Sequence, residues 1–520
     1  MKIRVGLGRA PCLIAASLGL VLASCGDSTG VTDAGSTGQG LTTTATTATT
    51  PTTTGEPTTS TDPTAGSMSE AMSTSTAPTT GATDTAATST TDPTDPTTTT
   101  TGDATTDPST GTTTGSTSGV VPETTTGTTG DGTTSDGTTG VAETTTGEPP
   151  PPCEPGDGMG MGMVEKSFIW ISSFNVNELS KVDTLTMTEL ARYKTGPANQ
   201  NPSRTAVSAD GRFVVVNNRD GGRSTMVAAN LADCVDKNGN GMIDTSQNKN
   251  NILAWDADEC GRWSVALPFA GSHQSGPRGV TWTPGVWSYD ECKYVEPKVW
   301  VGYLAGGGAA HFVRLDGQTG TVEETMVAPA WKGSGYAPYG AALDPQFRPW
   351  FSSLRGEFVR INTDENPITL TRITPPGTTQ SYGFTVDEDG NPWFGGCGGP
   401  VTVYDQKSQT FTAIAGTQAC HRGMAADAKY VWVASNGPCG IVQIDREART
   451  LIAKHNTNPC STAIGVSIDV EKNVWVVDQG GFAWKFNPEN VPGMMKVDVT
   501  GSHYVYSDMT GGQLLSILPQ

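Results

Sequence analysis

One stretch of the sequence has the spacing of oxygen ligands that hold a calcium ion. The segment DCVDKNGNGMIDTSQ fills positions 1, 3, 5, 6 and 9 of an EF-hand-type loop with Asp236, Asn238, Asn240, Gly241 and Asp244. Met242 offers its carbonyl oxygen at position 7. Position 12 is Gln247, so Asp256, Asp258 or Glu259 would have to supply the closing carboxylate. We expect a weak structural calcium site, although an Asn/Gly-rich loop that needs no ion has the same composition.

Strands must position any functional residues, and one strand pattern recurs along the chain. Seven short apolar strands share one form: FIWISS, RFVVVN, KVWVGY, RPWFSS, NPWFGG, YVWVAS and NVWVVD. Each has one residue at an equivalent position, which we call its anchor: Trp170, Val214, Trp300, Trp350, Trp393, Trp432 and Trp475. The last four anchors follow their predecessors by 50, 43, 39 and 43 residues, and an Asp precedes each of these four by five or six residues: Asp344, Asp387, Asp427 and Asp469. A four-stranded unit at this period predicts an all-β, seven-bladed β-propeller.

The two ends of the folded part are expected to pair. The glycine-rich segment before Trp170 offers no inner strand for the first blade, whereas SHYVYSD at 502–508 aligns with the inner strand SYGFTVD at 381–387. We therefore expect the C-terminal strand to close the first blade.

Aligned without gaps, the inner strands begin at Ser203, Arg278, Tyr339, Tyr382, Arg422, Ile464 and His503, with Arg204 and His421 as immediate neighbours. Arginines and tyrosines thus gather at one mouth of the central channel. The ligand-binding candidates are Arg204, Arg278, Tyr339, Tyr382 and Arg422, which would clamp an anionic or polar ligand. Propeller channels are also lined by polar side chains that contact water. A channel that binds no ligand would therefore have the same composition.

The cysteines indicate an oxidising compartment. Apart from Cys12 and Cys25, eight remain, an even number that favours disulfides in an exported protein. Cys234 and Cys260 bracket the insertion 234–260, and a bridge there would contribute about 3 kcal/mol. Positions in successive blades favour Cys397–Cys420 and Cys439–Cys460, with Cys420–Cys439 as the rival. The pairing of Cys153 and Cys292 stays open. No CxxC spacing indicates a zinc site.

The string G-x-x-x-D-x-x-G-x-x-W-[FV], seen best in YGFTVDEDGNPWF, resembles blades of the streptogramin (virginiamycin B) lyase-like propellers over residues 167–510. The resemblance implies a magnesium-dependent elimination that opens a cyclic ester with a histidine base. On that alternative the catalytic candidates are His421, His503 and Asp478. The chain has no Glu-x-His pair and no acid at a ring position to hold magnesium, so we favour a binding module over a carbon-oxygen lyase.

The N-terminus is expected to be a targeting signal. Residues 1–25 have a basic start, a short apolar stretch and the ending Leu22-Ala23-Ser24-Cys25, which resembles the lipobox of bacterial lipoproteins with Cys25 as the lipidated residue. Residues 26–152 are rich in Thr, Ser, Gly, Pro and Asp and predict a disordered linker. Residues 153–520 then form the propeller.

The charge pattern refines the expected partners. The formal charge is −20 overall, but the linker holds 15 acidic residues and no basic one. Such a chain lacks the basic footprint of nucleic-acid binding. We expect a lipid-anchored protein of the cell envelope, on the outer membrane of a Gram-negative source and exposed outside the cytoplasm. Its partners would be the membrane, through Cys25, and a small anionic or polar ligand or an envelope protein.

Overall fold

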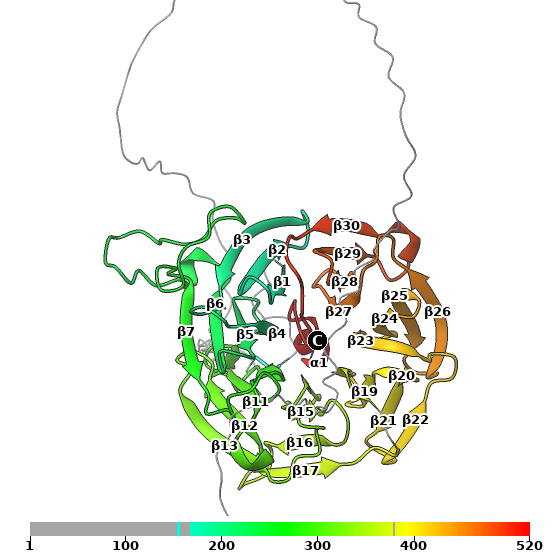
Figure 1. Ribbon diagram of the computed structural model, residues 1–520. Coiled ribbons are helices and arrows are strands. Elements are labelled where there is room, and N and C mark those ends of the chain that lie inside the picture. Colours follow the sequence, from blue (N-terminus) through cyan, green and yellow to red (C-terminus); the bar gives the residue numbers. More distant parts are fainter. Residues whose placement is uncertain (1–152, 156–166, 378–379, 520) are drawn as a thin grey trace, which may run out of the picture. The chain divides into compact units, whose positions relative to one another are not determined.

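The structure is a computed structural model that describes residues 153–155, 167–377 and 380–519. The leader expected at 1–25, including Cys25, and the linker expected at 26–152 lie outside the described residues. Those described form seven small sheets arranged in a ring, the seven-bladed propeller that the repeat predicts (Figure 1). The fold prediction is confirmed.

Each blade is an antiparallel sheet whose strands follow one another from the channel outward. Blade 1 holds β1 (Phe168–Ser173), β2 (Glu178–Asp183) and β3 (Thr188–Lys194). Blade 2 holds β4 (Pro202–Val207), β5 (Phe213–Asn218), β6 (Arg223–Ala228) and β7 (Gly261–Ala266). Blade 3 holds β8 (Val280–Thr283), β11 (Lys298–Leu304), β12 (Ala310–Asp316) and β13 (Val322–Ala328), with the hairpin β9 (Val286–Ser288) and β10 (Lys293–Val295) inserted after β8.

The later blades repeat this order. Blade 4 holds β14 (Gly340–Leu343), β15 (Pro349–Ser352), β16 (Phe358–Asn362) and β17 (Thr369–Ile373). Blade 5 holds β18 (Gly383–Val386), β19 (Pro392–Gly395), β21 (Thr402–Asp405) and β22 (Thr410–Ala413). Blade 6 holds β23 (Ala419–Ala426), β24 (Tyr430–Asn436), β25 (Cys439–Asp445) and β26 (Thr450–Asn456), and β20 (Cys397–Gly399) pairs with β23. Blade 7 holds β27 (Ala463–Ile468), β28 (Val474–Asp478), β29 (Phe482–Phe486) and β30 (Met495–Asp498).

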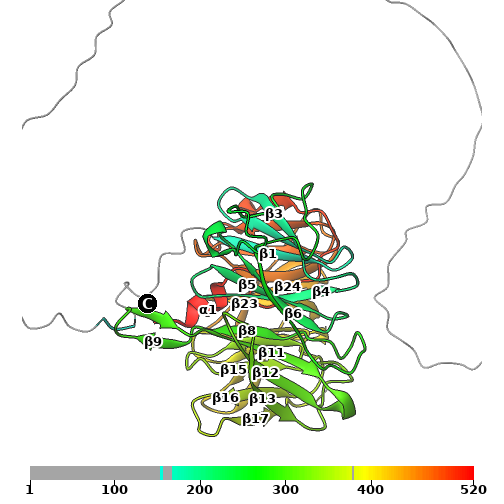
Figure 2. The same ribbon diagram turned by 90° about the vertical axis from the view of Figure 1, so that its left-hand side faces the viewer.

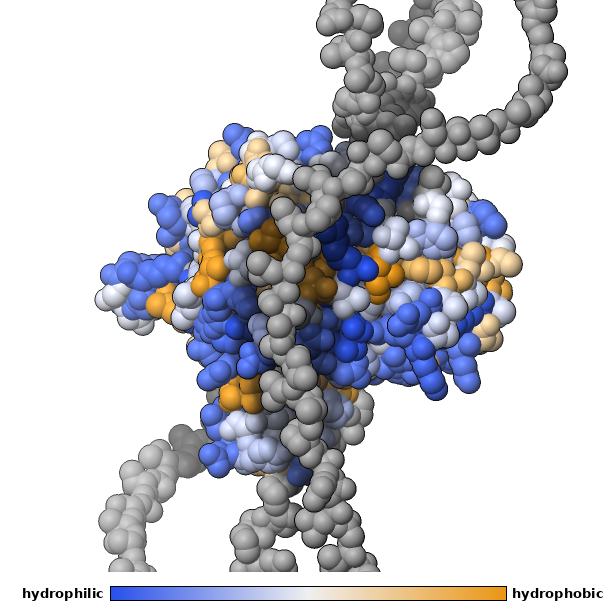
Figure 3. Space-filling view, turned by 90° about the horizontal axis from the view of Figure 1, so that it is seen from below, coloured by the Kyte–Doolittle hydropathy of each residue, from blue (hydrophilic) through white to orange (hydrophobic). Residues whose placement is uncertain are grey.

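Helical structure among the described residues is limited to short pieces. These are α1 (Gly512–Ile517) and the 3₁₀ turns η1 (Leu231–Asp233), η2 (Gly306–Gly308) and η3 (Val491–Gly493). The insertion between β6 and β7 projects from the edge of the ring (Figure 1). Hydrophilic residues predominate on the face that Figure 3 shows, and its hydrophobic residues form separate patches.

Six of the seven predicted anchors lie in the second strand of their blade and Trp170 lies in β1; all seven are at most 1% exposed. In four blades one aspartate carboxylate ties the first turn to the anchor. Asp387 shows the arrangement: one oxygen accepts the backbone N–H groups of Asp389 (3.1 Å) and Asn391 (2.8 Å), and the other accepts Nε1–H of Trp393 (2.8 Å). The same carboxylate-to-indole bond recurs at Asp344–Trp350, Asp427–Trp432 and Asp469–Trp475.

The C-terminal segment 502–509 lies beside β1 and closes the ring. Phe174 N–H donates to the Ser502 carbonyl (3.0 Å), Tyr504 N–H to the Ser172 carbonyl (3.2 Å) and Trp170 N–H to the Met509 carbonyl (3.0 Å). Instead of the expected regular strand, the segment makes isolated bridges, because it also pairs in parallel with β4 through Thr205 and Ser507. Blade 1 is thus completed from the other end of the chain.

Beyond this segment α1 closes one end of the channel. Asp508 accepts the backbone N–H groups of Gly511 (2.8 Å) and Gln513 (3.1 Å) at the start of the helix. Gln513 Nε2 donates to the carbonyl of Leu343, where β14 ends (2.9 Å). Figure 2 shows α1 on the same side of the ring as β9.

Removal of residues 500–520 should unfold the whole propeller in one transition, because blade 1 then loses its innermost pairing and the ring its closure. A matched truncation of only the last two residues should leave the melting temperature unchanged, since Pro519 is exposed. Calorimetry of both truncations checks this. An unchanged melting curve for the longer truncation would contradict ring closure.

Asp387→Asn should destabilise the domain by about 1–3 kcal/mol, because the amide cannot accept from Trp393 without giving up its backbone bonds. Asp389→Asn is the control in the same hairpin: the Asp389 side chain is 67% exposed and pairs with Arg446, a contact worth at most about 1 kcal/mol. Denaturant midpoints measure both variants. Equal midpoints would show that the carboxylate-to-indole bond adds nothing.

Candidate functional site

Four arginines and four tyrosines come together in the channel, at the end where the inner strands begin. Arg204 lies in β4, Arg219 follows β5, Arg278 precedes β8 and Arg422 lies in β23. Tyr339 and Tyr382 precede β14 and β18, and Tyr504 and Tyr506 belong to the C-terminal segment. We call these eight residues the channel cluster. Six of the seven blades contribute to it.

The guanidinium groups of the cluster lie over tyrosine rings. Arg204 is 4.1 Å from the ring centroid of Tyr339 and 4.4 Å from that of Tyr506. Arg219 is 4.0 Å from the ring of Tyr504. The other two stacks are Arg422 over Tyr382 at 4.3 Å and Arg278 over Tyr339 at 5.1 Å. Such contacts are attractive because the ring face is negative.

Three phenol groups form a chain at the centre of the cluster. The hydroxyl of Tyr504 lies 2.6 Å from that of Tyr339 and 2.8 Å from that of Tyr382. Burial alone would raise the pKa of Tyr504, but Arg204, Arg219 and Arg278, with the bond from Tyr339, outweigh it and lower this pKa to about 7. Burial raises the pKa of Tyr339, Tyr382 and Tyr506.

The arginines of the cluster lack acidic partners among the described residues. None of the four forms an ion pair with an aspartate or glutamate there, and Arg204 is completely buried with no hydrogen-bond partner at Nε, Nη1 or Nη2. The Nε atoms of Arg278 and Arg422 also lack partners. Burying a cation without acceptors costs several kcal/mol. The arrangement therefore calls for acceptors from outside the chain, either water or an anion.

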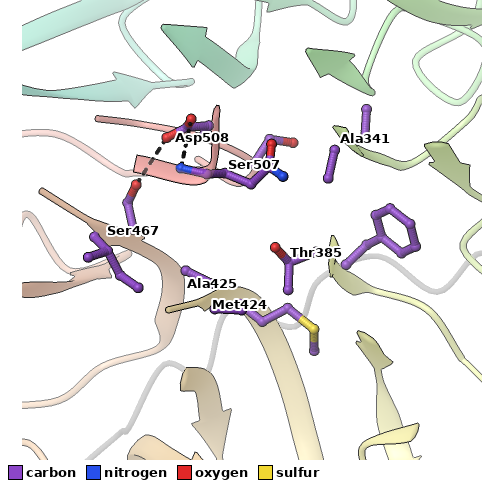
Figure 4. A pocket seen from close by; sticks show the side chains of 12 residues that line it. Ala341, Thr385, Met424, Ala425, Ser467, Ser507 and Asp508 are labelled. Carbon is purple, nitrogen blue, oxygen red and sulfur yellow. Dashed lines mark hydrogen bonds between the residues drawn. The ribbon is translucent and has the colours of Figure 1, made fainter. Parts of the chain in front are cut away.

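The channel cluster is largely buried. Tyr382 and Arg422 are half-buried at the mouth, whereas Arg204 and Tyr504 lie deeper. Toward α1 the channel narrows between small side chains such as Ala341, Thr385 and Ala425, where a cavity of about 10 Å³ remains (Figure 4). That space holds about one water molecule.

All five predicted ligand-binding residues (Arg204, Arg278, Tyr339, Tyr382 and Arg422) belong to the channel cluster. The prediction did not include Arg219, Tyr504 or Tyr506. Tyr504 and Tyr506 could have been found, because they directly follow His503, the ring position of the C-terminal strand. Arg219 follows the second strand of blade 2, whose end reaches the same mouth.

The predicted catalytic candidates are buried and bonded to the backbone or unpaired. His503 Nδ1 lies 2.7 Å from the Asp478 carbonyl oxygen, and burial lowers the pKa of His503 to about 4. His421 is also completely buried, its ring nitrogens have no partner among the described residues, and burial lowers its pKa to about 4. The Asp478 carboxylate accepts the backbone N–H groups of Ser461 (3.0 Å), Thr462 (3.1 Å) and Gly480 (2.8 Å). It holds the loop that enters blade 7.

The acidic loop of the insertion is curled on itself. Asp236 accepts the N–H groups of Gly239 (2.6 Å) and Gly241 (2.8 Å), which lower the pKa of this carboxyl group. The side-chain amides of Asn238 and Asn240 both reach one oxygen of Asp244, at 2.8 and 3.0 Å.

Among the three candidates for the closing carboxylate, Glu259 lies against the loop. Its two oxygens accept the N–H groups of Lys237 (2.7 Å) and Asp244 (2.8 Å). Asp258 instead bonds Ser246 (3.0 Å), and Asp256 is exposed.

Four disulfides join the eight cysteines of the propeller. They are Cys153–Cys292, Cys234–Cys260, Cys397–Cys420 and Cys439–Cys460. The first attaches the start of the described chain to the hairpin β9–β10, and Trp287 Nε1 donates to the Cys153 carbonyl there (3.1 Å). Sulfurs of Cys439 and Cys460 lie near Asp478, but as a disulfide they offer no thiolate to a metal.

Within the described ranges, no helix is both long and apolar enough to cross a membrane.

Comparisons with known proteins give structural likeness at low identity. No family profile matches the chain, and no curated protein matches it. A catalytically inactive virginiamycin B lyase from Staphylococcus aureus, with quinupristin, is 14% identical with a TM-score of 0.42, over 61% of this chain and 94% of that one. A protein from Lactobacillus plantarum is 15% identical (TM-score 0.45; 65% and 98%). BamB from Moraxella catarrhalis is 13% identical (TM-score 0.36; 65% and 85%).

Proposed function

We propose that this protein is a lipid-anchored component of the cell envelope whose propeller binds a small anionic ligand in the channel. The observation that carries the proposal is Arg204, a fully buried guanidinium without an acceptor. Arg219, Arg278 and Arg422 add three more cations around the same tyrosines. A carboxylate, sulfate or phosphate group would satisfy these donors, since guanidinium groups bind such oxyanions in bidentate fashion.

The expected location is supported from two directions. The sequence ending at Cys25 resembles a lipobox, and four disulfides fit an oxidising compartment outside the cytoplasm. The tether would join the propeller at Cys153, which is bonded to the hairpin on the α1 side. The channel cluster lies at the other end of the inner strands from α1.

Binding is favoured over the lyase alternative because of the state of the two histidines. With a pKa of about 4, His421 and His503 are neutral at physiological pH, as a base must be, but both are completely buried. Asp478, the carboxylate expected near magnesium, is grouped with the sulfurs of the Cys439–Cys460 disulfide and not with a second carboxylate. The magnesium-dependent elimination therefore gains no support from these residues.

Arg204→Met should separate a ligand site from a structural arginine. Without added anion, and at about pH 6 where Tyr504 is protonated, the variant should be at least as stable as the wild type, because an apolar side chain replaces a buried cation that lacks acceptors. Sulfate, phosphate or citrate should raise the melting temperature of the wild type by several degrees and leave that of the variant unchanged.

The matched control is Arg314→Gln. Arg314 lies on β12, is partly exposed and pairs with Glu323 and Glu324 of β13. This variant should keep the anion-dependent rise in melting temperature. An Arg204→Met variant that melts lower without anion, or a wild type that no anion stabilises, would contradict the proposal.

We also propose that the loop 236–247 holds a structural calcium ion. The oxygens of Asp236, Asn238, Asn240 and Asp244, the carbonyl of Met242 and the buried carboxylate of Glu259 form the donor set that this ion prefers. The glycines at 239 and 241 have positive φ angles of 73° and 81°, which let the loop turn sharply. The ion would brace the insertion together with the Cys234–Cys260 disulfide.

Calcium should raise the melting temperature of the wild type relative to a sample with chelator. Asp244→Asn should abolish the difference, because one anionic ligand is lost. The exposed Asp256→Asn, in the same insertion, should retain it. One melting temperature with calcium and with chelator would show that the loop needs no ion.

A further inference from the structure

We propose that Tyr504 is the first phenol of the ligand-free propeller to ionise and that, once it is a phenolate, the channel site takes up a proton at this residue when it binds its anion. This inference rests on the proposed function for its second half only. The first half concerns the free protein and can be tested without any ligand.

The count of protons in the phenol chain points to Tyr504. The hydroxyls of Tyr339 and Tyr382 have no other hydrogen-bond partner among the described residues than the oxygen of Tyr504. Each of these two hydroxyls needs an acceptor, so both are expected to donate to the oxygen of Tyr504. The hydroxyl proton of Tyr504 then has no acceptor among the described residues. Removing that proton leaves both hydrogen bonds in place and makes them charge-assisted. The middle oxygen of the chain is therefore the one that ionises.

The surrounding charges favour the same state. Tyr504 faces Arg204 from β4, Arg219 from the end of β5 and Arg278 from the start of β8, with centroid distances of 5.3 Å for Arg204 and 4.0 Å for Arg219. Arg422 from β23 acts through Tyr382 and Tyr506. The uncharged ring of Phe174 meets Tyr504 edge-on at 6.4 Å, and the neighbouring His503 is neutral above about pH 4.

No aspartate or glutamate of the described residues competes for these arginines at ion-pair distance. Asp220 on the rim is engaged with His273 (2.7 Å). The phenolate of Tyr504 is thus the resident counter-charge of the channel cluster. Burial and the neighbouring arginines Arg278 and Arg204 even lower the pKa of Arg219, although Tyr504 partly offsets them. The remaining positive charge is what attracts a ligand.

An incoming anion changes the charge that holds Tyr504 ionised. An oxyanion beside Arg204 neutralises part of the field at Tyr504, so the pKa of Tyr504 rises from about 7 in the free protein toward the ordinary tyrosine value. The complex then holds more protons than the free protein at pH values between the two pKa values. Binding is therefore independent of pH below about 7 and weakens above it, by at most about tenfold per pH unit. Above about pH 7 the site therefore binds an anion together with a proton taken from the solvent.

The free protein gives the first test, by ultraviolet titration of its phenols. One phenolate should appear with a midpoint near pH 7, well before ordinary tyrosines ionise near pH 10. Tyr504→Phe, which keeps the ring and its packing, should remove this transition. Tyr506→Phe is the matched control, because the Tyr506 hydroxyl has no partner and its pKa lies well above the ordinary value; the transition should persist. A missing transition, or one that survives in Tyr504→Phe, would overturn the assignment.

The second test uses sulfate, which carries the same charge throughout the range studied. Calorimetry should show the wild type binding sulfate more weakly at about pH 9 than at about pH 6, with protons taken up from the buffer at the higher pH. Tyr504→Phe should bind with equal affinity at both values. A wild-type affinity that does not depend on pH would overturn the proton uptake while leaving the anion site standing. No sulfate binding at either pH would contradict the proposed function and the uptake together.

Discussion

The structure depends on the return of the C-terminal segment to the first blade. Residues 502–509 supply the innermost pairing that β1 lacks, and the same residues place Tyr504 and Tyr506 inside the channel. Closing the ring and completing the channel cluster are therefore one event. A chain with an open ring would leave Arg204 facing a gap instead of two tyrosine rings.

The blades tolerate buried, unpaired arginines in the channel because the residues that stabilise each blade lie outside the channel. Buried tryptophans, each the anchor of its blade, and the carboxylates that hold four of them form cores outside the channel. The inner strands can then begin with arginine or tyrosine without loss of the blade. Glycines such as Gly279 and Gly383 allow neighbouring inner strands to approach closely, since a Cβ there would meet a backbone oxygen. The stability of the blades therefore does not depend on the residues of the channel cluster.

The blades and most of the channel cluster could be predicted from the sequence, because both follow from a repeat in which equivalent positions share a place in space. Trp300 to Trp475 fixed the period, and the period placed Arg204, Arg278 and Arg422 at one mouth. The bond between Tyr339 and Tyr504 joins residues 165 positions apart, and depends on how the ring closes. The lack of acceptors at Arg204 is likewise a property of packing. Neither has a local signal in the sequence.

The Arg204 guanidinium has no acceptor among the described residues, and we expect an anion from outside the chain to supply one. Bromide soaked into crystals of the propeller tests it directly, because anomalous scattering locates this anion without reference to the protein's chemistry. We expect a bromide peak within hydrogen-bond distance of the Arg204 guanidinium in the wild type, and none in the Arg204→Met variant. A channel without bromide in the wild type, with Arg204 bonded to a side chain of the protein, would contradict it.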